Sequence, residues 1–349
     1  MIGLDIGSFT VKAVQLHKSS SGWTVTAAGI ANIFRPDKDQ ADVEVMAKPQ
    51  AIDECLRVCD SSTNLAVCGV GGPEVAVRYF EFASTAPVDR NADLDEAVRT
   101  AATQVCPSAS DGIAVDYRLT SNGNGRTTGY WVAATNELVR NTVQVVEEAG
   151  LNCVLIDADG LALINCFSQL CGSPHGVAIL NVGNSHTTLA VEGSNDRPFI
   201  RHLSCGGNTI IDTLARETDV PADTLRGSLL NWDEDGPCGV PCSSAVYGAG
   251  FEKACSEFAV DVGSTLGYCR TLEPSFDVQE ILVCGDFASV SGFVNQLNKQ
   301  LSMKVSLWNP FKKMRCGVSR GRRGAVSKMS IRRNGPAMAV AAGLAMRSV

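Results

Sequence analysis

The feature that most constrains the fold of this 349-residue chain is a hairpin pattern that occurs twice. The first copy reads IGLDIGSFTVKAV from residue 2, and the second reads GVAILNVGNSHTTLAV from residue 176. Each copy alternates apolar and polar residues, turns at a glycine and returns as a second strand. Asp5 and Asn181 hold matching places, 176 residues apart. One repeat with so long a period predicts a duplicated, two-lobed α/β protein and not a solenoid.

The segment between the two copies predicts a further unit. Its patterns indicate two strand pairs and two amphipathic helices in the order β-α-β-β-α-β. The expected elements are residues 75–82, 93–105, 113–119, 129–135, 137–149 and 152–157. This order is that of a split βαβ unit, which we expect as an insertion in the first lobe.

These patterns divide the chain into four expected parts. They are a first subdomain (1–73 plus 156–174), the inserted subdomain (74–155), a second subdomain (175–218 plus 278–349) and a small helical subdomain of the second lobe (219–277).

Composition excludes disordered and collagen-like proteins. Hydrophobic residues make up 45% and charged residues 19%, which is ordinary for a globular protein. The net charge of −7 argues against a general nucleic-acid binder. Residues 312–333, however, hold nine Lys or Arg and no acidic residue. This basic segment is either a solvated loop or a contact for an anionic membrane surface.

No secretory signal or membrane span is evident. The chain opens with MIGLDIGS, which lacks a basic region, and its apolar run at 337–346 is far shorter than the ~20 residues of a spanning helix. We therefore expect a cytoplasmic protein. Most of the 14 cysteines lie in apolar strings, where Cys acts as a small hydrophobe. Cys55/Cys59 and Cys238/Cys242 each have three residues between them, and Cys238–Cys242 is the pair that merits a zinc or disulfide assay.

The first hairpin has the residue types of a phosphate-binding turn. Gly7 permits a tight turn whose backbone N–H groups can face an anion. Ser8 and Thr10 add hydroxyl donors, and Lys12 can neutralise a phosphate from the strand face that carries Thr10. Asp5 suits a hydrated Mg²⁺, which prefers one or two carboxylates plus waters.

The second hairpin strengthens this interpretation. A single turn of this type is common, but Gly183, Asn184 and Ser185 repeat it, followed by Thr187. A third glycine turn, Cys284-Gly285-Asp286, follows a buried strand and would let a base or ribose approach the backbone. Together the three turns predict a nucleotide site.

In this order the motifs resemble those of the actin/Hsp70/sugar-kinase superfamily. The five matching segments are LDIGSFTVKAV, DADGLALINCF, LNVGNSHTTLAV, ILVCGDFASVSGF and GPAMAVAAGLAM. Within the superfamily, the sequence is similar to the PilM family of type IV pilus assembly proteins, which is itself similar to FtsA. The resemblance covers nearly the whole chain, and VAVRYFEF, EEAGLNCVLIDADGLAL and HLSCGGNTI add to it.

The resemblance implies an actin-like, duplicated ribonuclease-H-type fold with an inserted βαββαβ subdomain, binding ATP and Mg²⁺ between its lobes. The implied nucleotide-binding residues are Asp5, Gly7, Ser8, Phe9, Thr10, Lys12, Asn181, Gly183, Asn184, Ser185, Thr187, Gly206, Gly207, Gly285 and Asp286, with Asp5 holding Mg²⁺ through water. The catalytic candidates are Asp5, Asn165 and Asn181.

The resemblance also implies a partner. This partner is the short cytoplasmic N-terminal peptide of a PilN-like inner-membrane protein, held beside the inserted subdomain by edge-strand addition. The chain would then be a cytoplasmic scaffold that reaches the inner membrane through its partners, and a homo-oligomer stays open.

Two positions depart from the pattern of the resemblance. Relatives begin the second hairpin with Asp where this chain has Asn181, and they carry Gly-Gly where it has Gly285-Asp286. We therefore expect nucleotide binding with little or no hydrolysis. Two alternatives remain open. One is a sugar or acyl kinase, which needs a carboxylate base near its acceptor hydroxyl. The other is an FtsA-like membrane-tethered filament protein, with residues 312–333 as its membrane contact.

Overall fold

The structure, a computed structural model, describes most of the chain. The exceptions are residues 37–42, 46, 60, 62, 84–90, 106–110, 124–125, 173–175, 231, 234–235, 238–247, 274–275, 318–330, 332 and 348–349. Cys238, Cys242 and most of the basic segment therefore lie outside the described residues.

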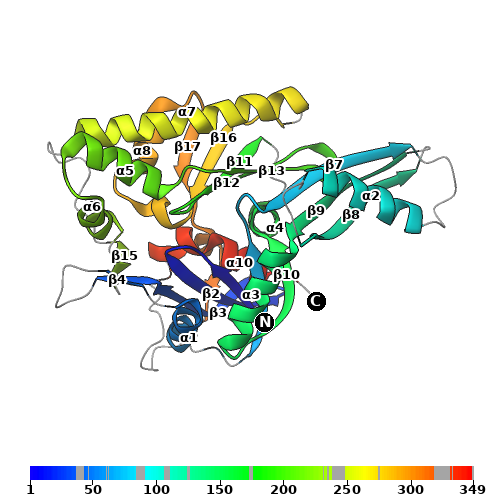
Figure 1. Cartoon of the computed structure of the whole chain (residues 1–349), viewed down its shortest axis with the longest axis horizontal. Coiled ribbons are helices and arrows are strands. Elements are labelled where there is room, and N and C mark those ends of the chain that lie inside the picture. Colours follow the sequence, from blue (N-terminus) through cyan, green and yellow to red (C-terminus); the bar gives the residue numbers. More distant parts are fainter. Residues whose placement is uncertain are drawn as a thin grey trace.

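The first lobe is built on a six-stranded sheet, in the lower part of Figure 1. The strands lie in the order β10 (Asn152–Ala158), β6 (Leu65–Val70), β1 (Ile2–Ile6), β2 (Thr10–Ser19), β3 (Gly22–Asn32) and β18 (Arg315–Cys316). Helix α1 (Lys48–Cys59) packs on β2 and β3 through Ala51, Ile52 and Cys55. Helices α4 (Asp159–Cys171) and α10 (Ala339–Ala345) cover the other face. The predicted opening hairpin and its third strand are confirmed.

The second lobe repeats this arrangement, as the duplicated hairpin predicted. Its sheet has the order β13 (Pro198–Leu203), β12 (Thr187–Glu192), β11 (Val177–Val182), β16 (Glu280–Cys284) and β17 (Lys304–Leu307). The sequence β13-β12-β11-β16 corresponds to β3-β2-β1-β6 of the first lobe, with the same parallel and antiparallel pairings.

Four helices complete the second lobe. They are α5 (Gly207–Thr218), α6 (Ala222–Leu229), α7 (Gly248–Leu272) and α8 (Phe293–Gln300). Their apolar side chains, among them Leu225, Phe251 and Phe258, share one cluster with the sheet. Helices α6 and α7 therefore have no separate core in the described part of the chain. The separate helical subdomain expected at 219–277 stays a prediction.

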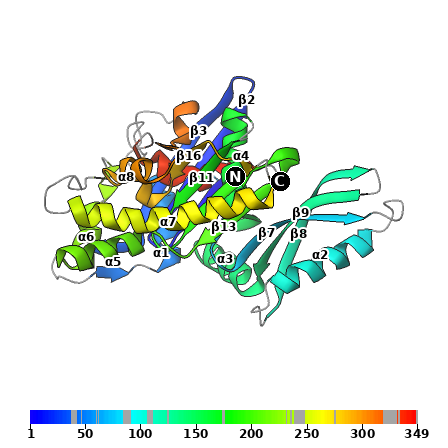
Figure 2. The same ribbon diagram turned by 90° about the horizontal axis from the view of Figure 1, so that it is seen from above.

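The inserted unit projects from the side of the molecule, as Figure 2 shows. It is an antiparallel sheet in the order β7 (Val75–Ala83), β9 (Arg126–Thr135) and β8 (Ile113–Gly123), with α2 (Asn91–Val105) on one face. Phe80, Val98 and Trp131 form its core. Its start at β7 and its hairpin agree with the expected order.

The expected last strand of the insertion is placed differently. Strand β10 pairs with β6 in the first-lobe sheet and has no partner in the inserted sheet. Helix α3 (Asn136–Glu148), capped by Thr135, likewise packs on α1, β6 and β10 as well as β9. The prediction that residues 152–157 are the last strand of the inserted unit is therefore wrong. A continuous apolar run such as CVLI suits a strand paired in a parallel sheet and covered by helices.

The inserted sheet also touches the second lobe. Strand β7 lies against β13, and the guanidinium of Arg197, just before β13, stacks over the ring of Tyr79 on β7 at 4.1 Å. Arg197 also forms an ion pair with Glu273, which follows α7. The unit is thus attached to the first lobe by chain connection and to the second by side-chain contact.

Shorter elements fill the remaining connections. They are the strands β4 (Phe34–Pro36), β5 (Val43–Val45), β14 (Trp232–Asp233) and β15 (Gly236–Pro237), and the 3-10 helices η1 (Ser194–Asp196), η3 (Asp286–Ser289), η4 (Pro310–Lys313) and η5 (Gly335–Met338). Across the described residues, no helix combines the length and apolarity that crossing a membrane would require.

The two connecting helices α4 and α10 cross at a close contact. A Cβ atom on Gly343 of α10 would lie 2.0 Å from the carbonyl oxygen of Ala162 on α4. Asn165 of α4 donates from Nδ2 to the Gly343 carbonyl oxygen at 3.1 Å. The backbones meet so closely that only glycine fits at position 343.

We predict that Gly343→Ala lowers the free energy of unfolding. The added methyl group overpacks a buried backbone contact, which costs about 1–3 kcal/mol. Gly267→Ala in α7 is the matched control, since no atom lies within 4 Å of its added Cβ. There the better helix propensity should stabilise by about 0.5–1 kcal/mol. Urea unfolding of both variants is the measurement, and equal effects would contradict the close contact.

Candidate functional site

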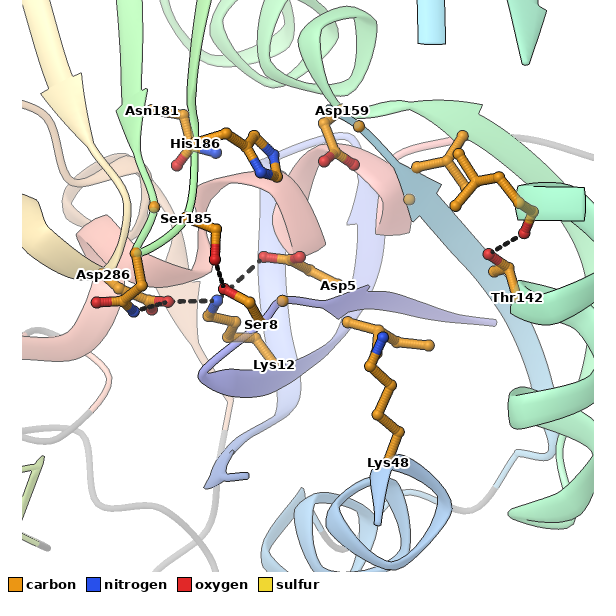
Figure 3. Close-up of a pocket in the computed structure, with 18 of the residues that line it drawn as sticks. Asp5, Ser8, Lys12, Lys48, Thr142, Asp159, Asn181, Ser185, His186 and Asp286 are labelled. Carbon is orange, nitrogen blue, oxygen red and sulfur yellow. Dashed lines mark hydrogen bonds and ion pairs between the residues drawn. The ribbon is translucent and has the colours of Figure 1, made fainter. Parts of the chain in front are cut away.

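A cavity of about 390 Å³ lies between the lobes, with the two glycine hairpins on its walls (Figure 3). Gly7 and Ser8 line it from the first hairpin, and Gly183, Asn184 and Ser185 from the second. Each turn is closed by an equivalent internal hydrogen bond. The Gly7 N–H donates to the Thr10 carbonyl at 3.0 Å, and the Gly183 N–H donates to the His186 carbonyl at 3.1 Å. The duplicated turn predicted from the sequence is therefore present in both lobes.

The two hairpins touch at their tips. The hydroxyl of Ser185 donates to that of Ser8 at 2.8 Å, across the boundary between the lobes. Phe9, next to Ser8, is buried in the apolar cluster of the second lobe. The tip of the first hairpin thus packs on the opposite lobe through the Phe9 side chain, and the expected nucleotide contact of Phe9 stays a prediction.

Lys12 is the central cation of the site. Its Nζ donates to Asp286 at 3.0 Å and lies 3.5 Å from Asp5. The side chain is only 5% exposed. Burial by itself lowers the pKa of the Lys12 ammonium, but the carboxylates of Asp286 and Asp5 outweigh it, so this pKa is raised above its usual value. Lys12 is therefore charged at all ordinary pH values.

Asp286 is the anion that faces Lys12. Both of its carboxylate oxygens accept from the Thr10 hydroxyl at 2.9 Å, and Oδ2 is 3.4 Å from Nδ2 of Asn184. The residue is 4% exposed. Its side chain reaches into the cavity from η3, the turn that the sequence analysis assigned to the adenosine, and joins donors from both lobes.

Asp5 lies at the end of β1 and lines the cavity. Burial raises the pKa of its carboxyl group, with a further contribution from Asp286, while Lys12 opposes the shift. One carboxylate facing a polar cavity fits a hydrated Mg²⁺, which needs only one or two such ligands. Among the described residues, no group of three or more His, Cys, Asp or Glu side chains is placed to hold a metal ion directly.

Several expected site residues support the walls without lining them. Thr187 is fully buried and donates to the Cys205 carbonyl at 2.8 Å. Gly206 and Gly207 lie against the second hairpin and the ring of Phe287, where a Cβ would clash. Gly285, at φ +97°, packs its Cα against Asn181 and Val182. Their expected contact with a nucleotide stays a prediction.

Of the two amide candidates for catalysis, one lines the cavity and the other does not. Asn181 lines the cavity at the end of β11, as expected from the duplication. Asn165 does not line it, because its side chain links α4 to α10. Asn165 therefore forms a helix–helix contact, and its expected catalytic role stays a prediction.

Asp159 is a site residue that the sequence reasoning missed. It begins α4, lines the cavity and has a buried carboxyl group whose Oδ1 has no hydrogen-bond partner. Burial raises the pKa of this group well above its usual value, and the nearby Asp5 and Asp157 add to the shift. The signal available was the pair of acids in IDADG at the junction of a strand and a helix.

The cavity continues towards the inserted unit. Glu74 precedes β7, Asn141 and Thr142 lie on α3, and Lys48 starts α1, all on its lining. His186 faces it from the second hairpin, and burial lowers the pKa of this imidazole, so that it is neutral at physiological pH. None of these side chains belonged to the expected set, because their elements are far apart in the sequence.

Two duplicated lobes, with matching glycine hairpins that meet at a polar cleft, define an actin-like ATPase-fold protein. The family described as type IV pilus assembly protein PilM matches residues 3–349. The chain therefore belongs to this family, as the resemblance in the sequence implied.

Solved structures support the fold. The chain is similar to a protein in the PilM–PilN type IV pilus biogenesis complex, with a TM-score of 0.76 and 19% identity over 99% of this chain and 97% of that one. It is also similar to a diol dehydratase-reactivating factor in nucleotide-free form (TM-score 0.53, 10% identity, 98% of each chain). A third neighbour is ethanolamine utilization protein EutJ from Carboxydothermus hydrogenoformans (TM-score 0.50, 12% identity, 99% of this chain and 88% of that one).

We predict that Asp159 makes the stability of the protein fall as pH rises above about 4. Near pH 3.8, the usual pKa of the carboxyl, the unfolded chain begins to release this proton while the folded chain keeps it. The free energy of unfolding then falls by up to about 1.4 kcal/mol per pH unit until the folded carboxyl ionises.

Asp159→Asn removes this loss, so the stability of the variant relative to wild type should increase from pH 4 towards neutrality. Thermal and urea unfolding at several pH values is the measurement. Asp212→Asn, which changes an exposed carboxylate on α5, is the control variant. A pH-independent difference between Asp159→Asn and wild type would contradict the prediction.

Proposed function

We propose that this PilM-family protein is a cytoplasmic scaffold of a type IV pilus or secretion assembly complex at the inner membrane. It binds Mg²⁺–ATP between its lobes and holds the cytoplasmic N-terminal peptide of a PilN-like membrane protein. The observation that carries the nucleotide part is the meeting of two glycine hairpins around buried Lys12. The partner part rests on family membership and on the likeness to the PilM–PilN complex.

The cavity supports nucleotide binding by size and by donors. Its volume of about 390 Å³ falls within the range of about 300–1,000 Å³ typical of ligand sites. The hairpins offer backbone N–H groups, the Ser8 and Ser185 hydroxyls and the Lys12 ammonium, which together suit a phosphate chain. Asp5 would hold Mg²⁺ through water. The nucleotide-free diol dehydratase-reactivating factor has a similar fold.

The same walls argue for slow hydrolysis. Phosphoryl transfer needs a fixed metal and an oriented water while charge moves to the leaving group. Asn181 supplies an amide where the first hairpin has the carboxylate of Asp5, so the metal shell has one charge fewer.

The inserted sheet offers the surface for a peptide. Within the described residues, β7 and β8 each pair only with β9, so both are edges of the sheet. An extended peptide can add to such an edge through main-chain hydrogen bonds. Leu119, on β8, is an exposed apolar side chain that such a peptide would cover.

We predict that wild-type protein binds ATP in the presence of Mg²⁺ and that Lys12→Ala weakens this binding about 10- to 100-fold. The factor corresponds to one charge-assisted hydrogen bond of about 1.5–3 kcal/mol. Isothermal titration calorimetry is the measurement, and Lys253→Ala, which removes a half-exposed lysine on α7, is the control. No heat at millimolar ATP would reject nucleotide binding, and turnover of about one per second or faster would reject slow hydrolysis.

We also predict that the N-terminal cytoplasmic peptide of the cognate PilN-like protein slows amide hydrogen exchange in the inserted sheet. Protection should concentrate in Val75–Ala83 or Ile113–Gly123, because the peptide hydrogen-bonds an edge strand. A peptide of the same composition in scrambled order is the control. Protection confined to α5 and α7 would place the partner elsewhere and reject edge-strand addition.

One observation favours a second candidate function, a small-molecule kinase. Asp159 places a carboxyl group with a raised pKa on the cavity wall, and a kinase needs a carboxylate base near the acceptor hydroxyl. Phosphorylation assays with a panel of sugars and acyl acceptors separate the two functions: steady ADP production that depends on one acceptor and is lost in Asp159→Asn would favour the kinase.

A further inference from the structure

The strongest unexplained feature of the cleft is the side chain of Asp286. It accepts hydrogen bonds from Thr10 and Lys12 on β2 of the first lobe, and Asn184 of the second lobe approaches it at 3.4 Å. Thr10 is completely buried, and Lys12 and Asp286 are each 4% exposed. A carboxylate held by an ammonium and a hydroxyl in this way has the donors that a phosphate oxygen would use.

The backbone at Asp286 is fixed on both sides. The Gly285 N–H donates to the Pro336 carbonyl at 2.9 Å, and Phe287 is fully buried with its ring 5.0 Å from that of Phe293. The turn therefore cannot withdraw as a unit without breaking the second-lobe core. A phosphate takes the place of Asp286 on Lys12 and Thr10 only if the Asp286 side chain rotates away or the lobes separate.

The charges around Lys12 also oppose the entry of a phosphate while Asp286 is in place. Asp5 and Asp286 both face this one ammonium group, and Asp159 lines the same cavity. Lys48 and Glu74, one residue of each sign, also line the cavity, and His186 has a lowered pKa and adds no positive charge at neutral pH. Even without a charge on Asp159, the carboxyl groups of Asp5, Glu74 and Asp286 outnumber the ammonium groups of Lys12 and Lys48, so a nucleotide phosphate enters against repulsion.

We infer that Asp286 is an internal anionic ligand of the phosphate-binding hairpins, a latch that closes the cleft and sets its affinity for nucleotide. Mg²⁺–ATP binds by displacing this carboxylate from Lys12 and Thr10. The inference rests on the proposed nucleotide function and adds the residue that regulates it.

The test compares Asp286→Asn and Asp286→Ala with wild type by calorimetric titration of ATP and Mg²⁺. Asparagine keeps the shape and removes the charge, whereas alanine removes the side chain. Both variants should bind ATP at least tenfold more tightly than wild type. Asp212→Asn, an exposed carboxylate on α5, makes the same charge change outside the cleft and should leave affinity unchanged. Equal or weaker binding by both Asp286 variants would overturn the latch while leaving the nucleotide function intact.

A second measurement needs no nucleotide. Hydrogen exchange of ATP-free protein should speed up in both hairpin turns, residues 6–10 and 182–187, in Asp286→Asn, while α5 and α7 stay as in wild type. This outcome supports the latch, because it shows that the Asp286 carboxylate holds the turns of both lobes. Unchanged exchange in the turns overturns it. If no variant binds ATP but the turns loosen, the nucleotide function fails and with it the role of Asp286 in setting affinity, whereas its closing of the cleft is supported.

Discussion

Lys12, on strand β2, links the two lobes of this protein, because its ammonium group contacts a carboxylate from each lobe. Its ammonium group lies 3.5 Å from Asp5 of its own lobe and 3.0 Å from Asp286 of the other. Removing one partner from a buried ion pair costs about 3–5 kcal/mol, because the remaining charge is left without compensation. The Ser8–Ser185 contact and the burial of Phe9 in the second lobe depend on the hairpin tip that this pair holds in place.

The same arrangement requires that the positive charge of Lys12 always faces an anion, although the identity of that anion can change. Lys12 stays protonated, so an anion has to face it at all times. Asp286 fills that requirement in the structure, and under the proposed function a nucleotide phosphate would fill it instead. Nucleotide binding would then be an exchange of anions on Lys12.

The sequence predicted the parts of this architecture that are local. Both glycine hairpins, the duplication and most helices follow from alternation, turns and spacing over about ten residues. Strand β10 could not be assigned that way, since its sequence suits either sheet and its pairing with β6 depends on residues about 85 positions away. Asp159 and Lys48 were missed for the same reason: they approach the cavity from elements that only the fold brings together. The sequence identified Asp286 as a departure, but the side-chain direction that pairs it with Lys12 depends on the fixed turn at Gly285.

The stack of Arg197 over Tyr79 has a thermodynamic consequence. It places a side chain of the second lobe on a strand of the inserted sheet, which is covalently part of the first. A change in the angle between the lobes therefore alters the free energy of this contact. A ligand of the cleft and a peptide on the inserted sheet would then act on one shared equilibrium. Linkage would require each to change the affinity of the other by the same factor, in the same direction.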